Sequence, residues 1–193
     1  MRRAGTTSWQ MGEDVSVSLS VALYVRDALG LPATKPFFIP PVVPAVPEHV
    51  PVIGPDVDID LADEWPKWFL DLPSKASSQP VPGMFLQSRS PAFRQAVEGY
   101  LEPAERFATA FRDNYFHPGY MKSQGLHINH LVSSIEKELG HRAAPFTLQL
   151  RILPVEGAWL HRAAPDLVLL SAGARADPAQ LHRLLGPIIR ELA

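Results

Sequence analysis

Eight prolines fall within residues 32–55, and this ladder restricts the fold more than any other feature of the chain. Each proline ring removes a main-chain N–H and clashes with the preceding helical turn, so the segment cannot form a helix. It cannot form a central strand either, because proline cannot donate to the ladder of hydrogen bonds. The residues between the prolines are mostly apolar, with Phe37, Phe38, Ile39 and Val43 among them. We therefore expect an extended arm that packs against its own domain or against another protein.

The composition is that of an ordinary folded domain, with 46% hydrophobic and 20% charged residues in a chain of 193. The chain has no cysteine, which excludes disulfides, thiolate nucleophiles and cysteine-based metal sites. A net charge of −2 and the lack of a long apolar run predict neither nucleic acid nor a membrane as partner. The composition favours a cytoplasmic location.

Residues 15–25 carry a pattern that fits two structures. Apolar and mostly polar residues alternate strictly from Val15 to Arg26, which is typical of a strand. The sequence Gly30-Leu31-Pro32 that follows is typical of a helix end, with glycine at the position that needs a positive φ. We favour a helix over residues 18–29 and keep the strand as an alternative. Residues 1–14 are polar and are expected to be loose.

Further along, helical periods alternate with one group of short strands. Helices are predicted for a short stretch around residues 64–70, from Pro91 to His117 with a kink or break at Pro103, over residues 124–139, and from Asp177 to the C-terminus with an interruption at Gly186-Pro187. Residues 146–153, 158–162 and 166–171 are predicted to form three strands joined by short turns. The expected fold is α+β, with a helical layer packed on a small antiparallel sheet and an extended proline-rich N-terminal arm. The expected organisation is a segment 1–31 with one short helix, an arm 32–55 and an α+β domain 56–193.

The histidines provide the candidate metal site. His127 and His130 are three residues apart on a predicted helix, so both imidazoles face the same side and could reach one ion. His117 could supply a third ligand by folding back over Pro118-Gly119. Whether the protein uses any cofactor stays unknown from the sequence.

One serine is placed where a nucleophile could lie. Ser171 follows a predicted strand, as the serine of a nucleophile elbow does, but Leu169 stands where that motif needs glycine. No complete catalytic motif is present, so the sequence does not decide whether the protein is an enzyme.

Two fragments of the chain resemble a bacterial family. Trp68 followed by Pro82-Gly83-Met84-Phe85-Leu86-Gln87-Ser88, and the stretch from Phe146 to Gly157, are similar to parts of the ligand-sensing region found behind a helix-turn-helix in many actinobacterial regulators. The spacing between the fragments is shorter here, and no DNA-reading helix pair precedes them. The resemblance implies a small-molecule-sensing regulatory domain.

The arm leads to the first functional hypothesis. Aromatic residues are enriched in the cores of interfaces, and several lie in or near the arm. We expect an interaction or assembly subunit that binds a protein partner or a second copy of itself through the arm. The predicted partner-binding residues are Phe37, Phe38, Ile39, Val43, Trp65 and Trp68. The alternatives are an enzyme that uses the His127 and His130 face, and the sensing domain, with its pocket between the two middle helices and the strands.

Overall fold

The computed structural model describes residues 2–5, 9–47, 61–72, 86–87, 89–118 and 127–193. The chain forms two compact units: unit 1 contains Met1–Val15 and Asn114–Ala193, and unit 2 contains Ser16–Asp113. These units differ from the predicted segments 1–31, 32–55 and 56–193, because the N-terminal strands join the C-terminal part of the chain. The α+β class is confirmed.

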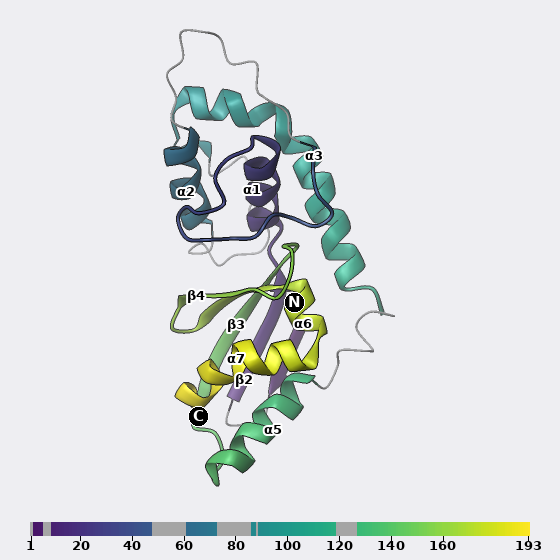
Figure 1. Ribbon diagram of the computed structural model, residues 1–193, viewed down its shortest axis with the longest axis vertical. Coiled ribbons are helices and arrows are strands. Elements are labelled where there is room, and N and C mark those ends of the chain that lie inside the picture. Colours follow the sequence, from purple (N-terminus) through teal and green to yellow (C-terminus); the bar gives the residue numbers. More distant parts are fainter. Residues whose placement is uncertain (1, 6–8, 48–60, 73–85, 88, 119–126) are drawn as a thin grey trace. The chain divides into compact units, whose positions relative to one another are not determined.

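Unit 1 is built on a five-stranded sheet with the order β1-β2-β3-β5-β4 (Figure 1). The strands are β1 (Arg2–Gly5), β2 (Trp9–Val15), β3 (Phe146–Leu153), β4 (Leu160–Ala164) and β5 (Leu167–Ser171). The three central strands run parallel, and the two edge strands pair antiparallel with their neighbours. The prediction of an antiparallel sheet is therefore wrong, and so is the prediction that residues 1–14 are loose, since β1 and β2 lie there.

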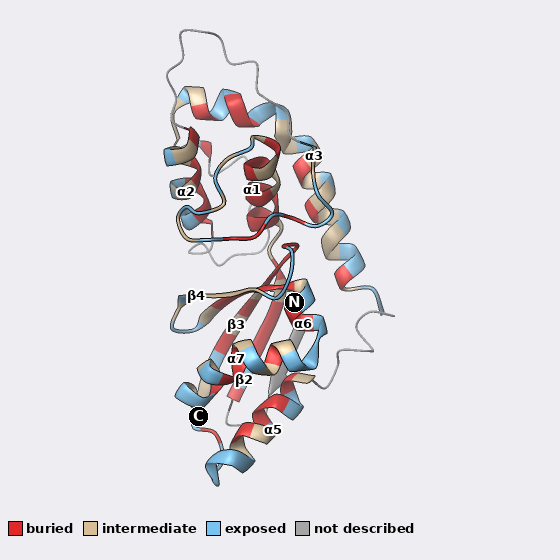
Figure 2. Ribbon diagram, in the orientation of Figure 1, coloured by how far each residue is buried: buried red, intermediate tan, exposed pale blue. Residues whose placement is uncertain are grey.

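The three predicted strands near the C-terminus are present, but they are not arranged as consecutive neighbours. β5 lies between β3 and β4. The burial of the strands explains this order: β5 is almost wholly buried, as a central parallel strand must be, whereas β4 is partly exposed along its length. Figure 2 shows the same contrast in colour.

The helices of unit 1 that precede β3 or follow β5 pack on one face of this sheet. These helices are α5 (His127–Leu139), α6 (Ala172–Ala176) and α7 (Pro178–Leu192). Residues Met11, Leu148, Leu150 and Val168 share this face by register and are buried beneath the helices. α7 contributes Leu181, Leu185 and Ile189 to the same core, and it continues through Gly186-Pro187, where an interruption was predicted.

The described residues of unit 2 form the helices α1 (Val17–Ala28), α2 (Leu61–Asp71) and α3 (Pro91–Tyr115) together with the first part of the arm. The last two residues of α3 belong to unit 1. α1 is buried along nearly its whole length, and Figure 2 shows it mostly red. Trp68 packs edge-on against Phe93 at 5.8 Å, which joins α2 to α3 in one core. Pro103 lies inside α3, and the axis of this helix changes direction in Figure 1, as predicted for a kinked helix.

The helix favoured over residues 18–29 is confirmed, since α1 covers Val17–Ala28, and the strand alternative is wrong. The Ser16 hydroxyl accepts a hydrogen bond from the Leu19 amide at 3.3 Å and caps the N-terminus. At the other end Gly30 has a φ of +62°, and the Leu31 amide donates to the Arg26 carbonyl at 2.9 Å. This is the glycine-terminated helix end that the sequence predicted. The alternation of apolar and polar residues, which is typical of a strand, does not mark an exposed face here, because the small side chains of Ser18 and Ser20 are buried in the core of unit 2.

Candidate functional site

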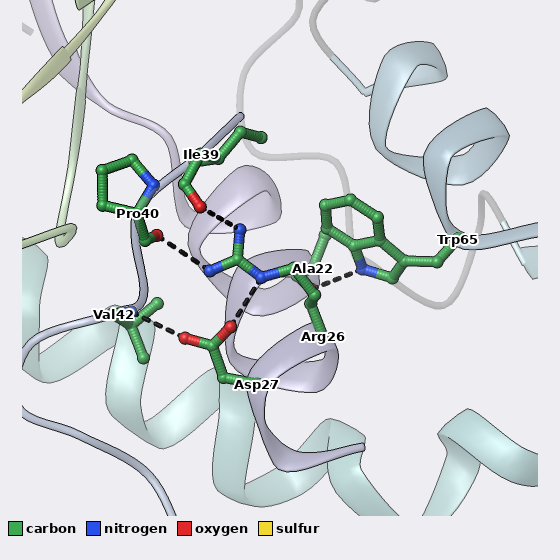
Figure 3. A network of polar contacts seen from close by, with 7 residues as sticks. All are labelled: Ala22, Arg26, Asp27, Ile39, Pro40, Val42 and Trp65. Atoms are coloured by element: carbon green, nitrogen blue, oxygen red, sulfur yellow. Dashed lines mark hydrogen bonds and ion pairs between the residues drawn. The ribbon is translucent and has the colours of Figure 1, made fainter. Parts of the chain in front are cut away.

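The first part of the arm lies on α1, held by a buried arginine (Figure 3). Arg26 sits in the last turn of α1 and is fully buried. Its guanidinium donates from Nη1 to the Ile39 carbonyl and from Nη2 to the Pro40 carbonyl, both at 2.8 Å. Its Nε donates to the neighbouring Asp27 at 2.6 Å. A buried cation is thus surrounded by acceptors, as its desolvation requires.

Asp27 completes the contact with the arm. Its Oδ1 receives the Arg26 bond and its Oδ2 accepts the Val42 amide at 2.6 Å. Pro40 and Pro41 have no amide to satisfy, and the Ile39 amide donates to the Ala33 carbonyl at 2.9 Å. Every main-chain N–H from residue 39 to residue 42 therefore has an acceptor, which permits this segment to be buried.

Aromatic side chains of α2 form the apolar wall of the same site. The Arg26 guanidinium lies 5.8 Å from the centre of the Trp65 ring, and the Trp65 indole donates to the Ala22 carbonyl of α1 at 2.7 Å. Phe69 stacks on Trp65 at 5.1 Å and receives the edge of Phe37 from the arm at 6.3 Å. We call Arg26, Asp27 and Trp65 the clasp.

The arm has an inner and an outer face. The inner face consists of Phe37, Ile39, Pro40 and Val42, which are buried or half-buried. The outer face consists of Phe38, Pro41, Val43 and Pro44, which are exposed. Phe38 keeps 59% and Val43 keeps 50% of its surface open, so the arm presents apolar groups outward from an anchored backbone.

These faces divide the predicted partner-binding residues. Phe38 and Val43 lie on the outer face, where a partner could reach them. Ile39, Trp65 and Trp68 are at most 1% exposed and belong to the core of unit 2, so their assignment to a partner surface is corrected. Phe37 is half-buried against Phe69. Residues 48–55 of the predicted arm lie outside the described residues.

The three histidines do not form the predicted metal site. Within the part of the chain that is described, no group of three or more His, Asp or Glu side chains is placed to hold a metal ion. His117 and His130 are exposed, and His127 is half-buried at the start of α5. Burial, followed by the positive charges of Arg175 and His130, holds the pKa of His127 below its usual value. These surroundings disfavour any cation there.

A buried ionic cluster in unit 1 was not foreseen from the sequence. Glu13 of β2 is 2% exposed and accepts a hydrogen bond from Arg175 Nε of α6 at 3.0 Å. The Tyr115 hydroxyl donates to the other oxygen of the same carboxylate. Glu13 and Arg175 are 162 residues apart in the sequence, so no local pattern brings them together. The cluster satisfies a carboxylate that β2 places on the helix-covered face of the sheet.

Ser171 has a structural role. Its hydroxyl donates to the Gly157 carbonyl at 2.8 Å and accepts the amides of Trp159 and Ala174 at 3.0 and 3.2 Å. The residue is fully buried and caps the N-terminus of α6. A hydroxyl with these three partners is not available as a nucleophile, so the nucleophile hypothesis is wrong.

Comparison with family models, with curated proteins and with solved structures found no match. The resemblance to actinobacterial regulators therefore stays a prediction. None of the helices in the described segments has the length and apolar content needed to cross a bilayer.

Proposed function

We propose that this protein is an interaction or assembly subunit that binds a protein partner through the outer face of its arm. The observation that carries the proposal is the contrast between neighbouring residues: Ile39 and Val42 are buried, while Phe38 and Val43 are half exposed or more. An exposed aromatic side chain beside a second exposed apolar side chain is typical of an interaction surface.

Because the main chain of the arm is fixed to α1, the outer face of the arm is suited to binding a partner. The clasp holds the main chain at residues 39–42, and Lys35 forms an ion pair with Asp63 of α2 at 2.6 Å. A partner that binds Phe38 and Val43 therefore has less chain entropy to remove than one that binds a loose segment. The prolines on either side limit the conformations of the arm further. The proposed partner is a protein with an apolar groove, which suits a proline-rich extended segment.

The test replaces Phe38 with a photo-crosslinking phenylalanine analogue in cells that express the full chain. The crosslinked partner, or a second copy of the chain, is identified by mass spectrometry and its affinity is measured with purified protein. We expect Phe38→Ser/Val43→Ser to weaken this binding at least about tenfold, as for a typical interface anchor. The matched control is Leu70→Ser, which changes a residue of α2 with 51% exposure and is expected to leave binding unchanged.

Two outcomes would contradict the proposal. One is a crosslink from position 38 that joins only residues within one copy of the chain. The other is equal binding by Phe38→Ser/Val43→Ser and Leu70→Ser. These substitutions are preferable to deletion of residues 32–55, because deletion would leave Arg26 and Asp27 of the clasp without the arm.

A further inference from the structure

The chain crosses between the two units twice, and both crossings lie in residues that the structure describes. The first falls between Val15, where β2 ends, and Ser16, which caps α1. The second falls between Asp113 and Asn114, inside α3. Boundaries between compact units usually fall in exposed, flexible segments. Crossings that run from a strand straight into a helix, and through a helix, favour coupling of the two units over independence.

A buried hydrogen bond in unit 1 holds the two crossings together. Glu13 lies two residues before the end of β2, and Tyr115 is the last residue of α3. The Tyr115 hydroxyl donates to Glu13, although 102 residues separate the two in the sequence. Arg175 of α6 donates to the other carboxylate oxygen at 3.0 Å, and all three residues are at most 3% exposed. Unit 1 therefore completes this cluster only when the first and last residues of unit 2 are near each other.

Unit 2 brings its own ends together when it folds. The ring centres of Tyr24 on α1 and Phe107 on α3 lie 5.4 Å apart, and both residues belong to unit 2. Tyr24 lies near the middle of α1, and Phe107 lies about two turns before the end of α3. An unfolded unit 2 is instead an open loop, and closing a loop of about 100 residues costs a factor of about 10³ in the equilibrium constant. Folding of unit 2 thus supplies the closure that the cluster in unit 1 needs.

We propose that the Glu13–Tyr115–Arg175 cluster couples the two units, so that the folding of unit 2 stabilises unit 1. The coupling is reciprocal, because a coupling free energy acts equally on both equilibria. A ligand that binds only the folded form of unit 2 then also stabilises unit 1. The coupling needs no partner on the arm, so it does not depend on the function proposed for the outer face.

The experiment perturbs unit 2 and measures unit 1 in the full chain. Arg26→Met removes the guanidinium that holds the arm and changes no residue of unit 1. We expect amide hydrogen exchange in β3, measured by mass spectrometry, to become at least about tenfold faster, with an upper limit of about 10³ from loop closure. The matched control is Arg106→Met, which removes an exposed ion pair of unit 2 and is expected to leave exchange in β3 unchanged. Unchanged exchange in β3 with Arg26→Met would overturn the proposal.

A second background tests whether the cluster carries the coupling. Tyr115→Phe keeps the ring and removes the hydroxyl that donates to Glu13. The end of α3 is then no longer bonded to β2, so we expect Arg26→Met to accelerate exchange in β3 at least about threefold less in this background than in the natural chain. Equal acceleration in the two backgrounds would overturn the proposal.

A third measurement needs no change in unit 1, in case Tyr115→Phe fails to fold. The Arg175 Nε–H donates to Glu13, and its hydrogen exchange is followed by NMR in the natural chain and in Arg26→Met. We expect this exchange to become at least about tenfold faster in Arg26→Met. Equal rates in the two chains would overturn the proposal. Unfolding of unit 2 in Arg26→Met leaves the measurement valid, because loss of unit 2 is the intended perturbation.

Discussion

Replacing Arg26 by methionine tests how far the clasp stabilises unit 2. The substitution keeps most of the apolar stem and removes the donors to the Ile39 and Pro40 carbonyls. It also removes the ion-pair partner of Asp27, whose side chain is 16% exposed. An unsatisfied buried carbonyl costs about 1–3 kcal/mol, and breaking a buried ion pair costs about 3–5 kcal/mol. These contributions overlap because one guanidinium makes all the contacts, so we expect a loss of about 3–5 kcal/mol in the free energy of unfolding.

Urea unfolding followed by tryptophan fluorescence measures this loss in unit 2 alone. The chain has four tryptophans: Trp9 and Trp159 lie in unit 1, and Trp65 and Trp68 lie in unit 2. A Trp9→Phe/Trp159→Phe background therefore reports on unit 2. With a slope of about 2 kcal/mol per molar urea, the midpoint is expected to fall by about 2 M.

The matched control is Arg106→Met. This residue pairs with Glu102 one turn earlier on α3, with side chains 71% and 81% exposed, and its loss is expected to cost less than about 0.5 kcal/mol. If Arg26→Met and Arg106→Met shift the midpoint equally, the guanidinium does not hold the arm and the reasoning is refuted.

Two further predictions concern unit 1. Burial lowers the folded-state pKa of His127, so the unfolded chain binds more protons and stability falls as the pH drops below about 6.5. We expect His127→Gln to reduce the dependence of the free energy of unfolding on pH, measured from about pH 7.5 to 5.5. Part of this dependence is expected to remain, because burial also lowers the pKa of His161. An unchanged dependence on pH would contradict the conclusion that His127 contributes to it. A Cβ at Gly12 would overlap only the carboxamide of Gln149 on β3, which is the end of a flexible, half-buried side chain and can turn aside, so Gly12→Ala is expected to cost less than about 1 kcal/mol and Gly12→Ala/Gln149→Ala to recover at least half of this cost. Additive losses in that double-mutant cycle would show that the two residues do not compete for space.

Local signals located most of the helices because the residues that end a helix act within one turn. Gly30 and Gly140 have φ values of +62° and +75° at the ends of α1 and α5, where the sequence placed helix stops. The Asp177 carboxylate accepts the Ala179 amide at 2.8 Å and starts α7 as expected. The predicted interruption of the last helix at Gly186-Pro187 is wrong, because α7 continues through both residues. Packing of Leu185 and Ile189 on either side of Pro187 accounts for this.

The sheet could not be predicted in the same way, because its pairings join distant residues. β2 pairs with β3 although all the residues of unit 2 lie between these strands in the sequence. Likewise Asp14 forms a hydrogen bond with Arg151, which lies 137 residues later in the chain. The short sequence of β2 has Gly12, Glu13 and Asp14 in it, which resembles a polar terminus. One signal was available: Leu167–Leu170 is a continuous apolar run, which favours a central parallel strand over a strand in a meander.

The clasp follows from the hydrogen-bonding groups that proline leaves on the main chain. Proline removes a main-chain donor but keeps its carbonyl, so a buried proline-rich stretch carries more acceptors than donors. Residues 39–41 contain three carbonyls and a single N–H. Burial of such a stretch requires a side chain that only donates and can reach two carbonyls at once, and arginine meets this requirement best. Arg26 near the end of a mostly apolar helix was the sequence signal for where the arm would lie, since a buried guanidinium needs acceptors as much as the arm needs donors.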